Sequence, residues 1–378
     1  VFASVFTMAM FLLDLLNDWM HTSFGEYISY HIWWLIFSLC AWPVSIIYLI
    51  FSFLFMGLKN KFGNSMVSKE DRYSKIVVIS GCDTGFGKEL SIHLARDCGY
   101  QVLSGCLKDE SIQSLEKLGG DNLKGALLDV TKDSSVESFT KVAQDMLKAD
   151  RKLSIFALVN NAGVGSGGAV DWLKVDQIRF DMEVNYFGMI RLTKSFLPFM
   201  KDIAIAHKNT NHTVMPRIVN ITSCAGLLPV PFMSAYSSSK HAAEAFSASL
   251  RMELNTWGIQ VITANPSFHA TPLVASGTDS ISRCWGSTPD DIKAQYGDGY
   301  VKATTDGWLA MIHGNTWDSL NVSKALAIAI SREHPQSQYL IGLDAMWTLP
   351  LVRMIPSWLR ENLTIKGFKV PVPASFRD

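Results

Sequence analysis

Short, mostly apolar runs recur along the chain, the first of them rich in β-branched residues, and they constrain the fold more than any other feature. They cover residues 75–80, 101–105, 123–129, 153–159, 217–222, 259–264 and 338–342, and strand-like runs alternate with helical stretches throughout. Buried parallel strands have this composition, and strands that alternate with helices form βαβ units. We therefore predict an α/β fold with a Rossmann-like, doubly wound parallel sheet in a single domain over residues 75–345.

A second constraint lies ahead of this domain. Residues 32–57 contain no charged side chain, and about 20 apolar residues suffice for a helix to cross a bilayer. We predict a transmembrane helix there, an unassigned segment over 1–31 and a polar juxtamembrane linker over 58–74. Lys59 and Lys61 follow the apolar run and no Lys or Arg precedes it, so the positive-inside rule places the rest of the chain in the cytosol.

The turn after the first predicted strand contains Gly81, Gly85 and Gly87. Glycines there permit a tight turn, close approach of backbone to phosphates and close packing of the next helix. That helix, predicted from about Phe86, would direct its free N–H groups at a pyrophosphate. The spacing is G-x3-G-x-G, so the position between a strand and a helix carries the argument for a dinucleotide loop.

The choice between NAD and NADP depends on charges near the second strand. That strand ends in Cys106, Leu107 and Lys108, without the carboxylate that would select NAD or the arginine that would favour NADP. Asp83 in the loop would repel a 2′-phosphate, whereas Lys108 would attract one. The balance favours NAD and leaves NADP open.

Tyr236 and Lys240 lie four residues apart, which puts them on one face of a helix. A free phenol, with a pKa near 10, is a weak acid–base catalyst at neutral pH. A neighbouring ammonium favours the phenolate and lowers that pKa. Tyr236 could then exchange a proton with an alcohol or carbonyl while a nicotinamide exchanges the hydride. Such a pair also arises by chance on helix surfaces, so its context decides.

The context consists of polar residues near strand ends. Ser223 follows the strand 217–222, where its hydroxyl could hold a substrate oxygen. The turn 160–163 follows another strand and suits a site beside a cofactor. Asn185 falls within a predicted helix although Asn is a poor helix former. Its amide could break the helix locally and bind a water that relays protons to Lys240; a turn serine and a solvent-facing amide are the ordinary alternatives.

Together these motifs resemble the short-chain dehydrogenase/reductase family over roughly residues 75–345. The resemblance implies a catalytic tetrad of Asn185, Ser223, Tyr236 and Lys240. The residues expected to contact the cofactor are then Gly81, Asp83, Gly85, Phe86, Gly87, Asp129, Asn161, Ala162, Gly163, Tyr236, Lys240, Pro266 and Thr271. Within residues 266–271, Ser267 replaces the glycine of the family pattern.

One branch of this family holds retinol dehydrogenases, 17-beta-hydroxysteroid dehydrogenase type 6 and 3-hydroxybutyrate dehydrogenase, and the chain resembles it over residues 81–87 and 105–107. The chain also resembles the retinol and steroid members of that branch over residues 292–297 and 342–346. The resemblance implies membrane attachment, a preference for NAD and a lipophilic alcohol, ketone or aldehyde as substrate. We expect the endoplasmic reticulum membrane, with the catalytic domain in the cytosol. The sequence leaves a homodimer open.

The substrate side is less regular. We predict a lid over 268–318, whose apolar residues would line a pocket or pack in the core. They are Phe268, Leu273, Trp285, Tyr296, Tyr300, Trp308, Leu309, Met311 and Ile312. The apolar tail 346–378 could rest on a membrane interface or pack on the domain, and Pro350 and Pro356 should prevent one straight helix. Residues 203–216 are expected to form a solvated loop, and His269 is expected to be structural.

Composition excludes other classes. The net charge is zero, so the chain lacks the basic excess that nucleic acid requires. Its six cysteines are scattered without zinc-ligand spacing, which predicts free thiols and no metal site.

Two alternative functions remain. A small hydroxy-acid dehydrogenase would need a basic pocket, and 268–318 offers only Arg283, Lys293 and Lys302. A non-catalytic, dinucleotide-binding membrane scaffold would be expected to lack Tyr236 or Lys240.

Overall fold

The computed structural model describes residues 65–208 and 214–376. They belong to one compact unit, Ser65–Asp378. The predicted transmembrane helix 32–57 and the segment 1–31 lie outside the described residues. Within the described part of the chain, no helix is both long enough and apolar enough to cross a bilayer.

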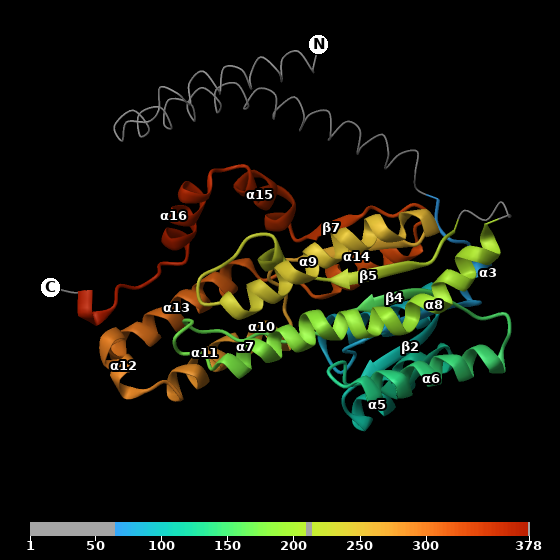
Figure 1. Ribbon diagram of the computed structural model, residues 1–378, viewed down its shortest axis with the longest axis horizontal. Coiled ribbons are helices and arrows are strands. Elements are labelled where there is room, and N and C mark those ends of the chain that lie inside the picture. The colour runs from blue at the N-terminus through green and yellow to red at the C-terminus, as the bar shows by residue number, and fades with distance from the viewer. Residues whose placement is uncertain (1–64, 209–213, 377–378) are drawn as a thin grey trace, which may run out of the picture. The chain divides into compact units, whose positions relative to one another are not determined.

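A single sheet, parallel throughout, organises the described residues, with the strand order β3-β2-β1-β4-β5-β6-β7 (Figure 1). The strands are β1 (Lys75–Ile79), β2 (Gln101–Cys106), β3 (Leu123–Leu127), β4 (Ser154–Asn160), β5 (Arg217–Ile221), β6 (Gln260–Pro266) and β7 (Gln338–Ile341). All seven predicted strands are confirmed to within two residues at each end. The predicted doubly wound parallel sheet is likewise confirmed.

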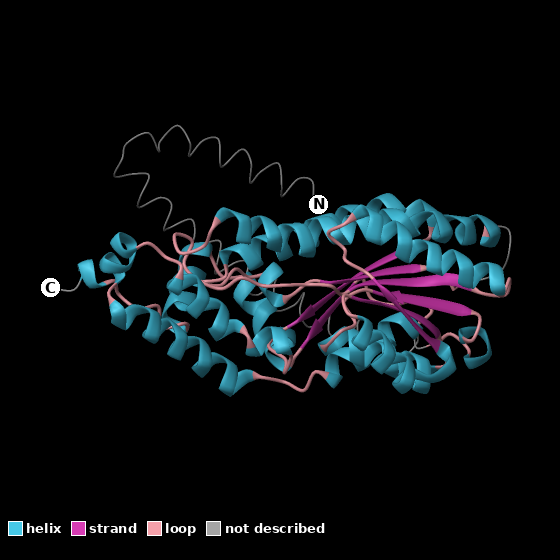
Figure 2. Ribbon diagram, turned by 90° about the horizontal axis from the view of Figure 1, so that it is seen from below, coloured by secondary structure: helices cyan, strands magenta, loops and turns pink. Residues whose placement is uncertain are grey.

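Helices cover both faces of the sheet, and Figure 2 shows the strands between two helical layers. One core includes side chains of α4 (Gly85–His93), α5 (Asp109–Gly119) and α14 (Leu320–Ser331). The other includes α6 (Asp133–Ala149), α8 (Met189–His207) and α9 (Ser234–Leu254). Successive strand residues point to opposite faces, so Val77 and Ile79 join the first core and Ile76 and Val78 the second.

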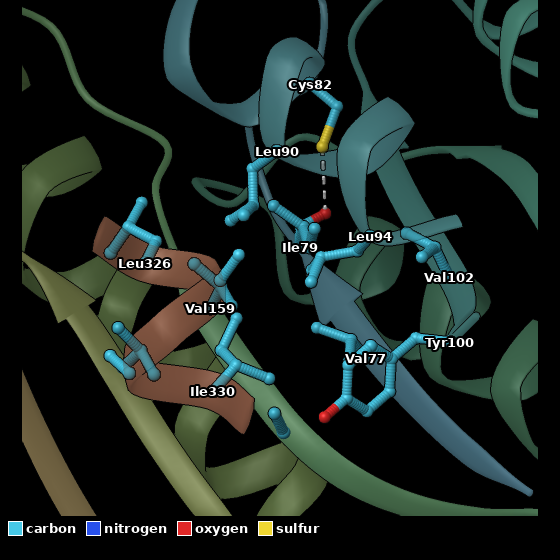
Figure 3. Packing of buried hydrophobic residues seen from close by; sticks show 14 of the residues in the cluster. Val77, Ile79, Cys82, Leu90, Leu94, Tyr100, Val102, Val159, Leu326 and Ile330 are labelled. Atoms are coloured by element: carbon cyan, nitrogen blue, oxygen red, sulfur yellow. Dashed lines mark hydrogen bonds between the residues drawn. The ribbon is translucent and has the colours of Figure 1, made fainter. Parts of the chain in front are cut away.

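Figure 3 shows the first of these cores. Leu90 and Leu94 from α4, and Leu326 and Ile330 from α14, surround strand residues such as Val159. All of these side chains are at most 1% exposed. Each buried aliphatic side chain contributes roughly 1.5–3 kcal/mol to folding, so this face alone fixes α4 firmly on the sheet.

The sheet also determines where a ligand can bind. The order of strands reverses at β1 and β4, which are neighbours although β2 and β3 come between them in the chain. Ligands of such sheets bind at the carboxyl ends of the strands at this switch point. The glycine loop follows β1 and the turn 160–163 ends β4, so both lie at this position.

The remaining elements are short turns and helices that precede, connect or follow these strands. They are α3 (Lys69–Arg72), the π-helices η1 (Leu94–Cys98) and η3 (Glu183–Gly188), the 3-10 turns η2 (Gly120–Asn122), η4 (Cys224–Gly226), η5 (Asn255–Trp257) and η6 (Ala374–Phe376), and the helices α7 (Val175–Met182), α10 (Pro272–Ala275), α11 (Gly277–Gly286), α12 (Asp290–Tyr296), α13 (Asp298–Asn315), α15 (Leu343–Arg353) and α16 (Ser357–Gly367). The predicted lid 268–318 is therefore largely helical.

Three expectations change. Residues 203–207 are the end of α8 and not a loop, because Ala204 is buried in the core and keeps the helix on the sheet. Pro356 does separate α15 from α16, but Pro350 lies inside α15. Part of the predicted linker is attached to the domain, since Val67 N–H donates to the Ser331 carbonyl at 2.8 Å.

Candidate active site

The glycine loop is pressed against the turn after β4. Gly81 and Gly85 adopt left-handed backbone with φ of +69° and +61°. A Cβ on Gly81 would lie 2.7 Å from the Ala162 Cα, and one on Gly87 would lie 2.4 Å from the Gly81 carbonyl oxygen. Side chains cannot be accommodated at these distances, so the loop requires glycine at both positions.

Asn161 and Ala162 hold this loop in place. The Asn161 side-chain amide donates to the carbonyls of Ser80 and Gly81, each at 2.9 Å. The backbone N–H groups of Asn161 and Ala162 both donate to the Ser80 hydroxyl at 3.0 Å. These two residues, expected to contact a cofactor, are thus also the support of the loop that would bind it.

The start of α4 has the properties of a pyrophosphate site. Thr84 is the N-cap residue and makes no side-chain capping bond, so the first N–H groups of the helix are left for a ligand. A Cβ on Gly85 would lie 3.6 Å from the Thr271 methyl group, so the loop after β6 faces the glycine loop. Phe86 packs its ring edge-to-face with buried His269 at 5.9 Å. The open helix end, the absent side chains and the facing Thr271 fit a dinucleotide.

Two carboxylates lie at neighbouring strand ends. Asp83 accepts hydrogen bonds from the backbone N–H groups of Leu107 at 2.9 Å and Lys108 at 3.2 Å. The loop therefore places a carboxylate at the end of β2, where this fold holds the adenosine ribose. The sequence predicts Asp83 as a loop carboxylate that would repel a 2′-phosphate, but the backbone bonds that hold it at the end of β2 cannot be read from the sequence. Beyond β3, Asp129 is held within its own turn by Thr131 and pairs with Lys132 at 3.0 Å.

The four residues of the expected tetrad come from three elements. Ser223 follows β5, Tyr236 and Lys240 lie on α9, and Asn185 lies in η3. Ser223 hydrogen bonds with the Tyr236 phenol. The Lys240 amine lies 5.7 Å from the centre of the Tyr236 ring and donates to the Ile221 carbonyl at 3.0 Å.

Asn185 does interrupt its helix, as predicted, because α7 continues as a π-helical turn around it. Its amide oxygen accepts from the Val164 N–H at 2.9 Å, and its NH₂ donates to the Val164 carbonyl at 2.8 Å and the Ser239 hydroxyl at 2.9 Å. Both side-chain N–H groups are therefore used by the protein, so a relay water cannot take a hydrogen bond from them. A Cβ on Gly163 would lie 3.3 Å from the Asn185 oxygen and 3.4 Å from the Lys240 amine.

Burial controls the electrostatics of Tyr236 and Lys240. It raises the pKa of Tyr236 to about 12; the Ser223 hydrogen bond opposes this rise, and Asp181 and Cys224 add to it. Burial lowers the pKa of Lys240 to about 8, against the charges of Asp181 and Glu244. The sequence predicted a lowered phenol pKa. In the protein alone this is wrong, because burial disfavours the charged phenolate more than the Ser223 hydrogen bond favours it.

Asp181 is the residue that sequence reasoning missed. It is 1% exposed on α7, and its two oxygens accept from the Ser166 N–H and hydroxyl, each at 2.9 Å. Burial raises its pKa. A Cβ on neighbouring Gly165 would lie 3.1 Å from the Tyr236 ring. Asp181 thus fixes the loop that packs on the phenol; a carboxylate one turn before Asn185 was its only signal.

A cavity of about 290 Å³ opens beside Tyr236 and Ser223. Most of its lining is apolar, and the residues are Gly165, Gly167, Ser223, Cys224, Ala225, Leu228, Val230, Phe232, Met233, Tyr236, Pro266, Ser267, Phe268, Leu273, Val274, Gly277, Ile281, Trp308, Asp344, Ala345, Thr348, Leu349, Val352 and Phe368. Among these described residues Asp344 alone is charged. Its oxygen accepts from the Ser267 hydroxyl at 2.7 Å and the Trp317 N–H at 3.0 Å, so it braces the loop 266–271.

The predicted pocket residues divide into two groups. Phe268, Leu273 and Trp308 line the cavity. The others mostly do not: Trp285, Tyr296, Tyr300 and Ile312 pack in an aromatic cluster around Trp172, Leu309 is 37% exposed, and the Met311 side chain lies outside the described residues. The wall formed by α15 and Phe368 was not predicted, since its residues have no pattern that separates them from ordinary core.

The arrangement suits proton transfer to or from an oxygen at the inner end of an apolar cavity. The Ser223 hydroxyl and the Tyr236 phenol lie together there, so one substrate oxygen can bond to both. Lys240 keeps its charge close to the phenol and to the cleft beside Gly163. When bound, a nicotinamide cofactor supplies the hydride donor or acceptor and, in its oxidised form, a positive charge that favours the phenolate.

Comparisons with known proteins agree with this geometry. A family model described as short chain dehydrogenase matches residues 75–281. The chain is 32% identical to 17-beta-hydroxysteroid dehydrogenase type 6 of Bos taurus over 79% of this chain and 90% of the relative. It is 31% identical to retinol dehydrogenase 16 of Mus musculus, covering 76% and 87% of the two chains. It is 30% identical to mitochondrial D-beta-hydroxybutyrate dehydrogenase of Bos taurus, covering 73% and 79%.

Solved structures show the same fold. A short-chain dehydrogenase/reductase from Burkholderia phymatum in complex with NAD has a TM-score of 0.58 and 22% identity, covering 75% of this chain and 94% of that one. A 3-ketoacyl-(acyl-carrier-protein) reductase from Brucella melitensis complexed with NADH has a TM-score of 0.55 and 18% identity, covering 70% and 95%.

Proposed function

The chain belongs to the short-chain dehydrogenase family, and we propose that this oxidoreductase transfers a hydride between NAD and a lipophilic alcohol, ketone or aldehyde of the retinoid or hydroxysteroid kind. The observation that carries the proposal is the cavity beside Tyr236. Its lining is apolar apart from a few polar groups near the phenol and Asp344, which is already hydrogen bonded. An apolar ligand with one reactive oxygen matches such a site.

In this proposal Tyr236 is the proton donor and acceptor, and Ser223 holds the reacting oxygen. Lys240 stabilises the phenolate, and Asn185 fixes the loop around Val164 through two hydrogen bonds and is tied to α9 through a third, to Ser239. The glycine loop, Asp129, Pro266 and Thr271 would contact the cofactor. The Asp83 carboxylate at the end of β2 supports NAD over NADP, because it would repel a 2′-phosphate there.

The proposal also includes membrane attachment through residues 32–57, with the catalytic domain in the cytosol at the endoplasmic reticulum. The uncharged run and the two lysines after it support this part. The retinol and hydroxysteroid dehydrogenases among the relatives support the substrate class.

A substrate panel tests the proposal. The purified full chain is assayed with NAD and NADP in parallel against a retinoid, several hydroxysteroids and 3-hydroxybutyrate. We expect NAD-dependent turnover of a retinoid or steroid and none of 3-hydroxybutyrate, since no basic side chain occurs among the described residues of the cavity wall. Turnover of 3-hydroxybutyrate alone would favour the hydroxy-acid alternative. Dinucleotide binding without turnover of any alcohol would favour the scaffold.

A further inference from the structure

A cluster of polar side chains ties the end of β5 to α9 and to the two strands beyond it. Its members are Thr222 after β5, Glu244 on α9, Asn265 on β6 and Gln338 on β7. Thr222 is 2% and Asn265 0% exposed, and Glu244 is half-buried. We propose that Glu244 is a positioning residue of the active site: its hydrogen bonds hold the strand end that carries Ser223, and its negative charge favours the charged form of Lys240.

The first argument is the pattern of hydrogen bonds around Glu244. One carboxylate oxygen of this residue accepts from both the Thr222 hydroxyl and the Asn265 side-chain N–H. The same Asn265 nitrogen donates to the Ser223 carbonyl at 3.3 Å, and the Asn265 side-chain oxygen accepts from the Gln338 amide at 3.0 Å. Connected networks of this kind fix geometry more sharply than single bonds. The carboxylate is therefore linked to the backbone of the catalytic serine through one buried side chain.

The second argument is that Lys240 and Glu244 together attach α9 to the end of β5. The two residues lie four apart, so their side chains leave the same face of the helix. The Lys240 amine donates to the Ile221 carbonyl at 3.0 Å, and Glu244 accepts from the hydroxyl of the next residue, Thr222. Ser223 follows directly in the chain. The helix that carries the catalytic phenol is thus bonded at two consecutive residues to the strand that carries the catalytic hydroxyl, so loss of the Glu244 carboxylate should disturb their relative position.

The third argument is charge, and it rests on the proposed function. Burial lowers the pKa of Lys240 to about 8, and the negative charges of Asp181 on α7 and Glu244 oppose this fall. The charged amine stabilises the phenolate that Tyr236 becomes when it gives its proton to a carbonyl. Removal of the Glu244 charge should lower the pKa of Lys240 further. Because carbonyl reduction needs a protonated phenol and a charged amine, its rate falls as the pH rises through the pKa of Lys240, and without Glu244 this fall should begin at lower pH.

Two other titratable groups face Glu244. Burial lowers the pKa of Arg251, which Glu244 opposes, but a guanidinium keeps its charge in proteins. Burial raises the pKa of the Cys224 thiol to about 12, and the charges of Asp344 and Glu244 add to this rise. Neither group changes its charge near the pKa of Lys240, so a shift in the pH dependence there reports on that amine.

Three variants of the full chain separate the bonds of Glu244 from its charge. Glu244→Gln keeps an oxygen that can accept from Thr222 and Asn265 and removes the charge. Glu244→Ala removes both the acceptor and the charge. Thr222→Val removes one bond of the cluster and leaves the charge. Glu253→Gln is the matched control, because Glu253 is exposed on the same helix.

The first measurement is kcat for NADH-dependent reduction of a lipophilic ketone as a function of pH. At about pH 6.5, below the pKa of Lys240, we expect kcat to fall about 10-fold in Glu244→Ala and by less in Glu244→Gln. The fall of kcat at higher pH should begin at lower pH, by a fraction of a unit, in Glu244→Gln. It should stay at the wild-type position in Thr222→Val and Glu253→Gln. A wild-type kcat in Glu244→Ala would overturn the positioning role, and an unmoved profile in Glu244→Gln would overturn the electrostatic one.

A second measurement needs no turnover. The full chain is labelled with carbon-13 at the lysine Cε, and the NMR signal of Lys240 is identified by its loss in Lys240→Arg. The midpoint of its titration should be lower in Glu244→Gln than in the wild type and unchanged in Glu253→Gln. If the wild type reduces no carbonyl, the proposed function fails, and this titration still decides whether Glu244 acts on Lys240. An equal midpoint in Glu244→Gln and the wild type would contradict that action.

Discussion

The catalytic residues and the wall of the substrate cavity are neighbours, but they are built in opposite ways. Asn185, Ser223 and Lys240 are held by directional bonds to backbone groups next to the sheet, and Asp181 fixes the loop on the phenol. The apolar side chains that α10, α11, α13 and α15 contribute to the cavity wall pack without directional bonds. Hydrogen-bond networks fix geometry sharply, whereas apolar packing tolerates substitution at similar volume. Changes at the first region should therefore alter kcat, and changes at the second should alter KM.

The largest effect is expected for Tyr236→Phe, which removes the proton donor and leaves the ring in place. General acid–base catalysis contributes about 100- to 10,000-fold, so kcat should fall by that factor. NADH binding, followed by fluorescence titration, should be unchanged. A variant that retains wild-type kcat would show that the phenol is not the proton donor.

Truncation of the cavity wall should act on KM. Leu349→Ala shortens a side chain that lines the cavity and is 6% exposed. We expect KM for the lipophilic substrate to rise by about 10-fold with little change in kcat. Leu320→Ala on α14 is the control, because that leucine is 47% exposed and away from the cavity lining. A loss of kcat in Leu349→Ala would mean that the two regions are not separable.

A smaller effect is expected at the cofactor end of the catalytic region. Asp83→Ser removes the negative charge that the N–H groups of Leu107 and Lys108 hold at the end of β2. The ratio of kcat/KM with NAD to that with NADP should fall by roughly fivefold, the size of one net hydrogen bond. An unchanged ratio would show that Asp83 does not face the ribose.

The smallest expected effect concerns pH. Burial raises the pKa of Tyr236 and lowers the pKa of Lys240. The negative charge of Asp181 adds to the first shift and opposes the second. Asp181→Asn keeps bonds to Ser166 and removes the charge. Because alcohol oxidation requires the phenolate, the acid limb of the kcat/KM profile should move to lower pH by a fraction of a unit. Asp176→Asn, on the exposed side of the same helix, should leave the profile unchanged; a shift to higher pH in Asp181→Asn would contradict the assignment.

The two regions also differ in how far the sequence predicts them. The strands and the Tyr236/Lys240 pair follow from composition and helical spacing, which are local properties. The backbone bonds that hold Asp83 at the end of β2, and the role of Asp181, were not predictable, because they depend on which groups the tertiary fold brings to each carboxylate. The pKa of Tyr236 was predicted with the wrong sign, since burial cannot be read from spacing. The α15 part of the cavity wall was not predicted, because the sequence pattern around Leu349 and Val352 is the same as that of ordinary core residues.

The central claim is that Tyr236 moves the proton when a hydride passes between the cofactor and a lipophilic carbonyl. The most direct measurement is a single turnover with NADH deuterated at the transferable C4 position and a retinoid aldehyde or ketosteroid. The wild type should place deuterium on the carbonyl carbon of the product, and Tyr236→Phe should do so at least about 100-fold more slowly with equal NADH affinity. Deuterium transfer at the wild-type rate in Tyr236→Phe, or none from the wild type to any lipophilic carbonyl, would contradict the account.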